Sequence, residues 1–265
     1  MASSNNRRKL AQTELEPHLK EEEIRNILHA ADSLVSLGGR TMLAKILKGS
    51  RDKKLLELGL DNNVAYGYYR SLTIEQITER VDWMIKNDFL ELEYRGDMPI
   101  LYFTDKGWTI QRDQAAGLLL QQWKRWVQEG IAEADMSYLK DRNRGMILIF
   151  LQKIAATCDD RFIPLLERWE LIDYQKVKKA IRQVVMHLKN KETSPLLLED
   201  APQADVSTEL LLQPRSSERI KCWECGDRFD WTVEEQDIFR MRGWEPPKRC
   251  ASCREERRKL RDSDW

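Results

Sequence analysis

The sequence lacks the features of membrane, secreted and most catalytic proteins. It has no apolar run of membrane-spanning length, and residues 1–9 are polar where a secretory signal would be apolar. Only three histidines are present, and no G-x-x-x-x-G-K-[ST] loop or Ser/His/Asp arrangement occurs. We therefore predict a protein that is not an enzyme, has no small-molecule substrate and does not bind a membrane.

The charge is balanced, with a formal net charge of zero and a pI of about 6.9. Proteins that coat nucleic acid indiscriminately are usually basic, so any such binding must come from local patches. The 265 residues suffice for one or two modest domains, and the 33% of charged residues leaves room for a flexible piece. Four of the five cysteines form two C-x-x-C pairs, which indicates metal ligation in a reducing compartment and a cytoplasmic protein.

The most informative stretch begins with a short apolar helix at Thr41 that leads into a basic, glycine-broken loop. Ser50 is placed to cap a following helix, Arg51 to Leu58, whose free N-terminal N–H groups would face a phosphate. The cations that flank this predicted phosphate site are Lys48, Arg51, Lys53 and Lys54.

Helical and strand periods follow one another in the first part of the chain. A helix is predicted from Glu21 to Leu37, and Thr73 with Gln76 forms the capping box of another. Two strands then follow, 89–94 and 98–103, joined by a turn at 95–97. Three helices and a two-stranded ribbon indicate a winged helix over residues 21–110.

Several motifs in this stretch resemble, in order and spacing, the RQC domain of RecQ-family helicases. They are Leu47-Lys-Gly-Ser50, Leu58-Gly59, Tyr66-Gly67 and Phe103-Thr-Asp-Lys-Gly107, and the likeness spans Ile24 to Gly107. With no motor motif, the chain is similar to the bacterial stand-alone "RQC-minor" DNA-binding proteins. The resemblance implies a loop that grips backbone phosphates and a wing that acts as a wedge at a strand junction. The implied DNA contacts are Lys48, Gly49, Ser50, Arg51 and Lys53 in the loop, and Tyr94, Arg95 and Met98 in the wing, whose shortness favours plain binding over strand separation.

Residues 111–190 are predicted to be helical. Trp123 and Trp126 lie on the apolar stripe of a helix from Ala115 to Gln128, which favours core packing over the stacking of nucleobases. Two later helices, 161–169 and 174–188, form a hairpin of HEAT-like type. Residues 191–218 contain scattered prolines and acids and are predicted to be a flexible linker. Its two leucine triplets, 196–198 and 210–212, are unusual for a linker, and the sequence does not decide whether they dock.

The two C-x-x-C pairs predict a metal site. Cys222, Cys225, Cys250 and Cys253 supply four thiolates for one Zn²⁺, and four sulfur ligands leave no position for a reactive water, so the zinc is expected to be structural. The pattern over Arg219 to Arg254 resembles a bacterial family of probable zinc-ribbon domains. A basic flank of this ribbon could face nucleic acid or an acidic protein; its residues include Lys248, Arg249, Arg254, Arg257 and Arg258.

The sequence thus predicts a mainly α-helical protein with a small β component. Its expected parts are a polar lead-in (1–20), the winged helix (21–110), a helical domain (111–190), a linker (191–218) and a zinc ribbon (219–265). The leading hypothesis is a DNA-binding protein that recognises duplex ends or branched DNA by backbone and shape. The alternatives are a protein-interaction adaptor in a repair, transcription or defence complex, and RNA binding through the ribbon.

Overall fold

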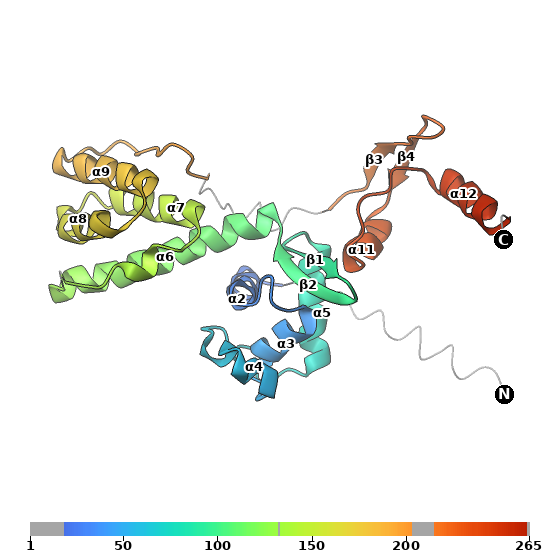
Figure 1. Ribbon diagram of the computed structural model, residues 1–265, viewed down its shortest axis with the longest axis horizontal. Coiled ribbons are helices and arrows are strands. Elements are labelled where there is room, and N and C mark those ends of the chain that lie inside the picture. Colours follow the sequence, from blue (N-terminus) through green and yellow to red (C-terminus); the bar gives the residue numbers. More distant parts are fainter. Residues whose placement is uncertain (1–18, 132, 203–214, 264–265) are drawn as a thin grey trace. The chain divides into compact units, whose positions relative to one another are not determined.

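The computed structural model describes residues 19–131, 133–202 and 215–263, which belong to two compact units (Figure 1). One unit combines the residues up to Gly107 with those from Glu209 onward, and the other runs from Trp108 to Thr208. The described residues are mainly helical, as predicted, and both two-stranded sheets lie in the first unit. None of the helices in these residues combines the length and the apolar character that a membrane span needs.

Three helices enclose the core of the first unit: α2 (Glu21–Asp32), α3 (Arg40–Lys48) and α5 (Ile74–Lys86). The short α4 (Lys53–Glu57) and a 3₁₀ turn (Leu60–Asn62) follow α3. The predicted capping box of α5 is confirmed, because Thr73 Oγ1 accepts from Gln76 N and the Gln76 side chain accepts from Thr73 N. The apolar stripes of these helices are buried; among their members are Ile24, Ile27, Leu43, Ile46, Ile77 and Val81.

The prediction that the first helix continues to Leu37 is wrong, since α2 ends at Asp32. The chain after it pairs instead with the second strand of the wing. Ser36 N donates to Leu101 O at 3.2 Å, and Leu101 N donates to Gly38 O at 3.0 Å. This backbone pairing competes with the helical hydrogen bonds and gives the wing a short third, strand-like partner.

The predicted hairpin is present as β1 (Leu90–Arg95) and β2 (Met98–Phe103), which pair antiparallel with Leu90 opposite Phe103. Leu101 directs its backbone bonds toward residues 36–38. Its partner Leu92 therefore directs its own backbone groups toward the outer edge of β1, because hydrogen-bonded and non-hydrogen-bonded pairs alternate in an antiparallel ladder.

The second unit is built from helices around a tryptophan. Its helices are the greater part of α6 (Asp105–Glu129), α7 (Arg144–Ala155), α8 (Ile163–Ile172) and α9 (Gln175–Lys189), with 3₁₀ turns at Ser137–Leu139 and Asp160–Phe162. Trp123 is fully buried, and its ring lies 5.0 Å from Phe150 and 5.7 Å from Trp169, centroid to centroid. The prediction that Trp123 packs in the core is thus confirmed. α6 begins ten residues before the predicted start at Ala115.

Part of the predicted linker packs against this unit. Residues 196–202, here called the leucine strap, place Leu198 in the core with 6% exposure. Gln152 Nε2 donates to Leu196 O at 3.3 Å, and Lys179 pairs with Glu199 at 3.0 Å. The first leucine triplet therefore docks on the chain's own helices, which corrects the prediction that these residues are flexible. The second triplet lies outside the described residues.

The C-terminal module consists of β3 (Glu218–Lys221), β4 (Arg228–Trp231), α11 (Val233–Met241) and α12 (Ala251–Ser263). β3 and β4 form an antiparallel hairpin with Lys221 opposite Arg228. The first cysteine pair lies in the turn of this hairpin, and the second lies at the start of α12. A hairpin knuckle facing a helix start is the arrangement of a treble clef, which is a more specific description than the predicted ribbon.

Candidate metal centre and nucleic-acid interface

The four predicted zinc ligands come together. Their Sγ atoms all lie within 4.8 Å of one another, and those of Cys225 and Cys250 are 3.9 Å apart. A tetrahedral zinc with Zn–S bonds of about 2.3 Å places its sulfurs about 3.8 Å apart, so the quartet needs shifts of at most about 1 Å to hold this ion. Cys222, Cys250 and Cys253 are buried, whereas Cys225 is exposed at the rim of the module.

The surroundings of the sulfurs favour a bound cation. Burial alone would raise the pKa of Cys222, but the backbone N–H groups of Cys225, Cys250 and Glu224 outweigh it and lower this pKa to about 6. The hydrogen bond with Cys250, together with burial, raises the pKa of Cys253 to about 12. Four thiols so close together cannot all ionise unless a cation compensates their charge. The site is therefore a structural zinc site, and its four protein sulfurs leave no open coordination position.

The predicted phosphate loop forms, with different roles for its members. The ammonium group of Lys48 donates to Arg70 O at 2.7 Å and to Leu72 O at 2.6 Å. Lys48 thus holds the segment before α5 against the end of α3. Gly49 caps α3 in the left-handed region at φ 74°, and its N–H donates to Ile46 O. Ser50 N donates to Lys45 O. These three residues set the shape of the loop.

Asp52, not Ser50, caps α4, which corrects the prediction at this position. Its carboxylate accepts from Lys54 N and Leu55 N and pairs with Lys45 at 2.7 Å. The hydrogen bond from Lys45 is the main cause that lowers the pKa of Asp52. Two N–H groups that were expected to face a phosphate therefore face a carboxylate. These two N–H groups are not available to a phosphate.

A second loop packs onto the first. Gly67 N donates to Ile46 O, Tyr69 N donates to Leu47 O, and Tyr66 Oη donates to Ser50 O at 3.0 Å. A Cβ at Gly49 would lie 3.0 Å from Gly67 Cα, so the two backbones touch. The Tyr66-Gly67 pair is one of the motifs that resemble the RQC domain, and in the structure it supports residues 46–50.

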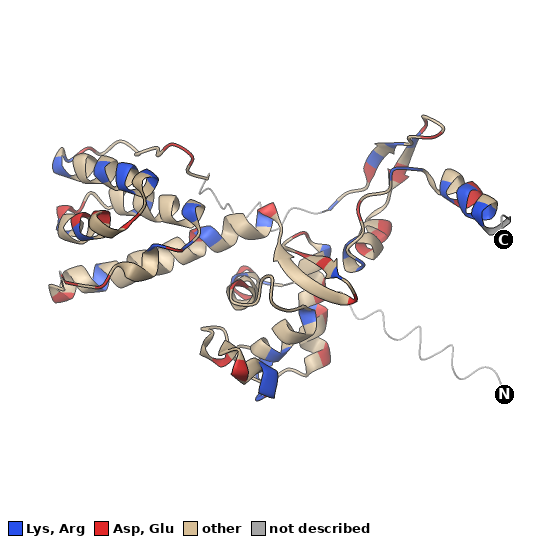
Figure 2. Cartoon of the chain, viewed as in Figure 1, with Lys and Arg blue, Asp and Glu red and all other residues tan. Residues whose placement is uncertain are grey.

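The exposed cations of this corner are Arg51, Lys53, Lys54 and Arg70. Arg51, Lys54 and Arg70 have no acidic partner among the residues that the structure describes, whereas Lys53 lies 3.7 Å from Glu57. Arg70 Nε would lie 3.3 Å from a Cβ at Gly49, which places its side chain against the loop. In Figure 2 the basic segments of α3 and α4 lie next to one another. Arg70 was not singled out in the sequence.

The predicted wing residues gather at the tip of the hairpin, separate from the loop residues in the chain. Tyr94 and Met98 are 50% and 63% exposed, and Arg95 lies opposite Met98. Arg95 donates to Tyr102 Oη, and its guanidinium lies 5.9 Å from the centre of the Tyr102 ring. The tip thus presents an aromatic ring, a thioether and a cation to solvent.

The basic flank of the treble clef is largely neutralised. Arg249 and Arg257 both reach Glu224, at 2.7 and 3.6 Å, and Lys248 pairs with Glu245 at 3.1 Å. Arg254 pairs with Glu235 at 2.5 Å. Of the predicted set, only Arg258 has no acidic partner within the described part of the chain.

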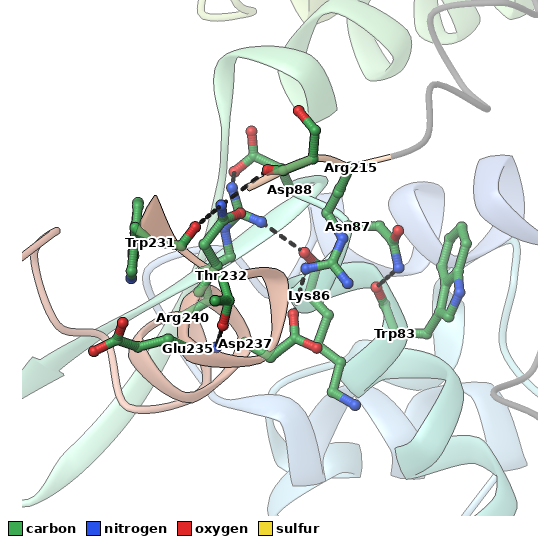
Figure 3. Close-up of polar contacts among 12 residues, drawn as sticks. Trp83, Lys86, Asn87, Asp88, Arg215, Trp231, Thr232, Glu235, Asp237 and Arg240 are labelled. Atoms are coloured by element: carbon green, nitrogen blue, oxygen red, sulfur yellow. Dashed lines mark hydrogen bonds and ion pairs between the residues drawn. The ribbon is translucent and has the colours of Figure 1, made fainter. Parts of the chain in front are cut away.

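The treble clef also packs against the winged helix. No pattern in the sequence predicts this contact. Arg240, on α11, donates to Lys86 O at 2.9 Å and lies 3.6 Å from Asp88, at the end of α5 (Figure 3). Arg215 pairs with Asp237, which also lies on α11. α11 contacts both α5 and β1. The wing and the zinc module are therefore parts of one packed unit.

Comparison with known proteins agrees with both modules. Residues 20–125 match the RQC domain family, and residues 218–262 match the family described as a probable treble clef domain. A stretch of 76 residues is 30% identical to the ATP-dependent DNA helicase RecQ of Bacillus subtilis (strain 168); it makes up 29% of this chain and only 13% of the helicase. No solved structure matches the chain. Neither matched family is a catalytic domain. The chain contains an RQC domain of winged-helix form and a treble-clef domain with a zinc site.

Proposed function

We propose that this chain is a non-enzymatic DNA-binding protein that recognises duplex ends or branched DNA through its RQC domain. The matched domain and the helicase relative support DNA as the ligand. Recognition by backbone and shape is supported by the chemistry of the corner between α3 and α4. Its exposed groups are cations on a fixed loop, which suit phosphates and carry no base-specific pattern of donors and acceptors.

The observation that carries this proposal is the set of three exposed cations without acidic partners among the described residues: Arg51, Lys54 and Arg70. Arg51 and Arg70 follow two loops that brace each other through backbone hydrogen bonds, and Lys54 lies in the first turn of α4. We assign phosphate contact to these three and to Lys53. Lys48, Gly49 and Ser50 act as positioning residues, because the Lys48 ammonium group and the backbone N–H groups of Gly49 and Ser50 are already engaged within the protein.

The wing supplies the second contact. Tyr94, Arg95 and Met98 stand at a two-residue turn, where they can meet the end of a duplex or a junction. Because the hairpin extends only to Arg95 and Met98, we expect it to cover an exposed base pair and not to drive strands apart. We place the protein in the cytoplasm, where the reducing milieu keeps the four zinc-ligand cysteines and Cys158 from forming disulfides.

Fluorescence anisotropy with blunt, forked and single-stranded DNA across a salt series tests the proposal. Arg51→Glu should weaken duplex binding about thirtyfold at low salt, because one phosphate contact is lost and one repulsion is added, each worth about 1 kcal/mol for charges in water. The slope of log K against log salt should fall in magnitude by about 0.9 for one lost phosphate contact.

Arg168→Glu is the matched control, since it makes the same charge change at an exposed position of α8. It should leave both the affinity and the slope unchanged. Equal effects of the two variants would mean that net charge, and not this corner, governs binding. Equal affinity for the three DNA shapes would remove the claim of shape recognition, and tighter binding of RNA of the same shape would replace DNA as the ligand.

One observation favours an adaptor role as a second candidate. Leu171, in the last turn of α8, and Tyr174, just before α9, are 77% and 58% exposed. Tyr174 also lines a cavity of about 400 Å³ beside α7 and α9. Exposed apolar groups beside a hollow are typical of protein contacts. Recovery of one stoichiometric partner after nuclease treatment, lost with Leu171→Asp and Tyr174→Asp, would support this role.

A further inference from the structure

The turn after α11 is seated on the outer edge of β1. A Cβ at Gly243 would lie 2.3 Å from Leu92 O, and Gly243 has φ 62°, so only glycine fits this approach. The same position would lie 3.2 Å from Cδ2 of Tyr94, which places the Tyr94 ring directly against the turn. Arg240 fixes α11 through Lys86 O and Asp88, as Figure 3 shows.

The turn presents a second aromatic side chain beside the wing. Trp244 is 51% exposed, and Tyr94, across Gly243, is 50% exposed. The Trp244 ring contacts Phe239 edge to face at a centroid distance of 5.5 Å, and Phe239 in turn contacts Trp231. The indole is therefore held in place by packing, yet half of it faces solvent. Large, rigid aromatic groups in this state are typical of binding surfaces.

The groups around the Trp244 ring suit a stacked base. Arg242 lies over the Trp244 ring, 4.6 Å from its centre, and neither Arg242 nor Arg95 has an acidic partner within the described residues. Arg95 lies on the other face of β1 from Tyr94, against Tyr102, so Arg242 is the cation shown on the Trp244 ring. Exposed, packed rings with a guanidinium group stacked on the indole suit the stacking of a base, to which the arginine adds a cation–π contact.

We propose that Tyr94 of the wing and Trp244 of the treble clef form a joint platform on which an unpaired base of single-stranded DNA stacks, next to the duplex held by the RQC corner. This platform rests on the proposed function and adds a second ligand element to it. It also assigns the zinc module a task at the DNA, which is to present Trp244 beside the wing.

The test compares a blunt duplex with the same duplex that carries a short single-stranded overhang containing 2-aminopurine, both titrated with the full zinc-loaded chain. The overhang should bind more tightly, and its fluorescence should be quenched by stacking. Trp244→Ala should weaken binding of the overhanging duplex at least about fivefold, which is the lower end of what the stacking of one base contributes. It should leave the affinity for the blunt duplex unchanged. Trp244→Phe, which keeps a ring, should retain most of the preference and the quenching.

Trp223→Ala is the control, because Trp223 is 73% exposed and lies in the first zinc knuckle. It should change neither probe. Zinc content of one per chain in each variant verifies that the treble clef is folded. Equal affinity of the unaltered chain for the two duplexes would overturn the platform and leave the proposed function standing. Binding of the overhang that depends on Trp244, without any binding of the blunt duplex, would support the platform and refute the duplex grip.

Discussion

Replacing Gly243 by alanine tests how firmly the zinc module is attached to the wing. An ordinary contact begins near 3.4 Å, so a Cβ at 2.3 Å from Leu92 O forces the turn and the strand apart by about 1 Å. The positive φ of Gly243 adds a strain of roughly 1–2 kcal/mol for a residue with a side chain. If the separation also breaks the hydrogen bond from Arg240 to Lys86 O, a further 1.5–3 kcal/mol, roughly, is lost, as for other bonds from charged donors.

Gly96→Ala is the matched control for this variant. Gly96 has φ 63°, and a Cβ added there would meet no atom within 4 Å, so alanine introduces strain without a clash. We expect a loss of unfolding free energy of about 1–2 kcal/mol for Gly96→Ala and about 3–5 kcal/mol for Gly243→Ala. Urea unfolding of the zinc-loaded chain gives both values, and hydrogen exchange of the β1 segment should accelerate only in Gly243→Ala. Equal losses in the two variants, with unchanged exchange in β1, would refute the packing described.

The zinc site, the leucine strap and the α4 cap each lead to a further prediction. Cys253→Ser should reduce bound zinc from one per chain to none and unfold the treble clef, whereas Cys158→Ser, at an exposed thiol outside the site, should retain one zinc by metal analysis. Leu198→Ala should cost about 2–5 kcal/mol of unfolding free energy in the second unit, as for other buried leucines, while Leu197→Ala, 84% exposed, should cost almost nothing. The folded-state pKa of Asp52 lies below the ordinary 3.8. The Asp52 carboxylate therefore stabilises the fold above pH 3.8, and this contribution is lost as the pH falls through the lowered pKa. In a pH series, the acid-induced loss of stability should be smaller for Asp52→Asn.

The zinc site and the winged helix were predictable because their signals are local. The four cysteines form two close pairs, so only the one loop between the pairs has to close to bring them together. The capping box of Thr73 and Gln76 defines a helix start within four residues. The hairpin was equally predictable, since its two strands are joined by a short turn.

What sequence reasoning missed depends on partners distant in the chain. Ser50 and Asp52 are both good capping residues, so the local sequence does not choose between them. Asp52 forms the cap, and its carboxylate also pairs with Lys45 in the preceding helix. α2 ends early because residues 36–38 pair with Leu101, more than sixty positions away. The docking of Arg240 on Lys86 O spans 154 positions, and no period or motif records it.

The seat of Gly243 on Leu92 O also bears on how the protein behaves in solution. An uncovered strand edge offers free N–H and C=O groups to any other extended chain and is a template for self-association. Here the C-terminal module covers part of the outer edge of β1, and residues 36–38 cover part of the far edge of β2. A fragment that ends after α6 would keep the winged helix and lose one of these covers. Such a fragment should be the more prone to aggregate, even though every residue of its own core is present.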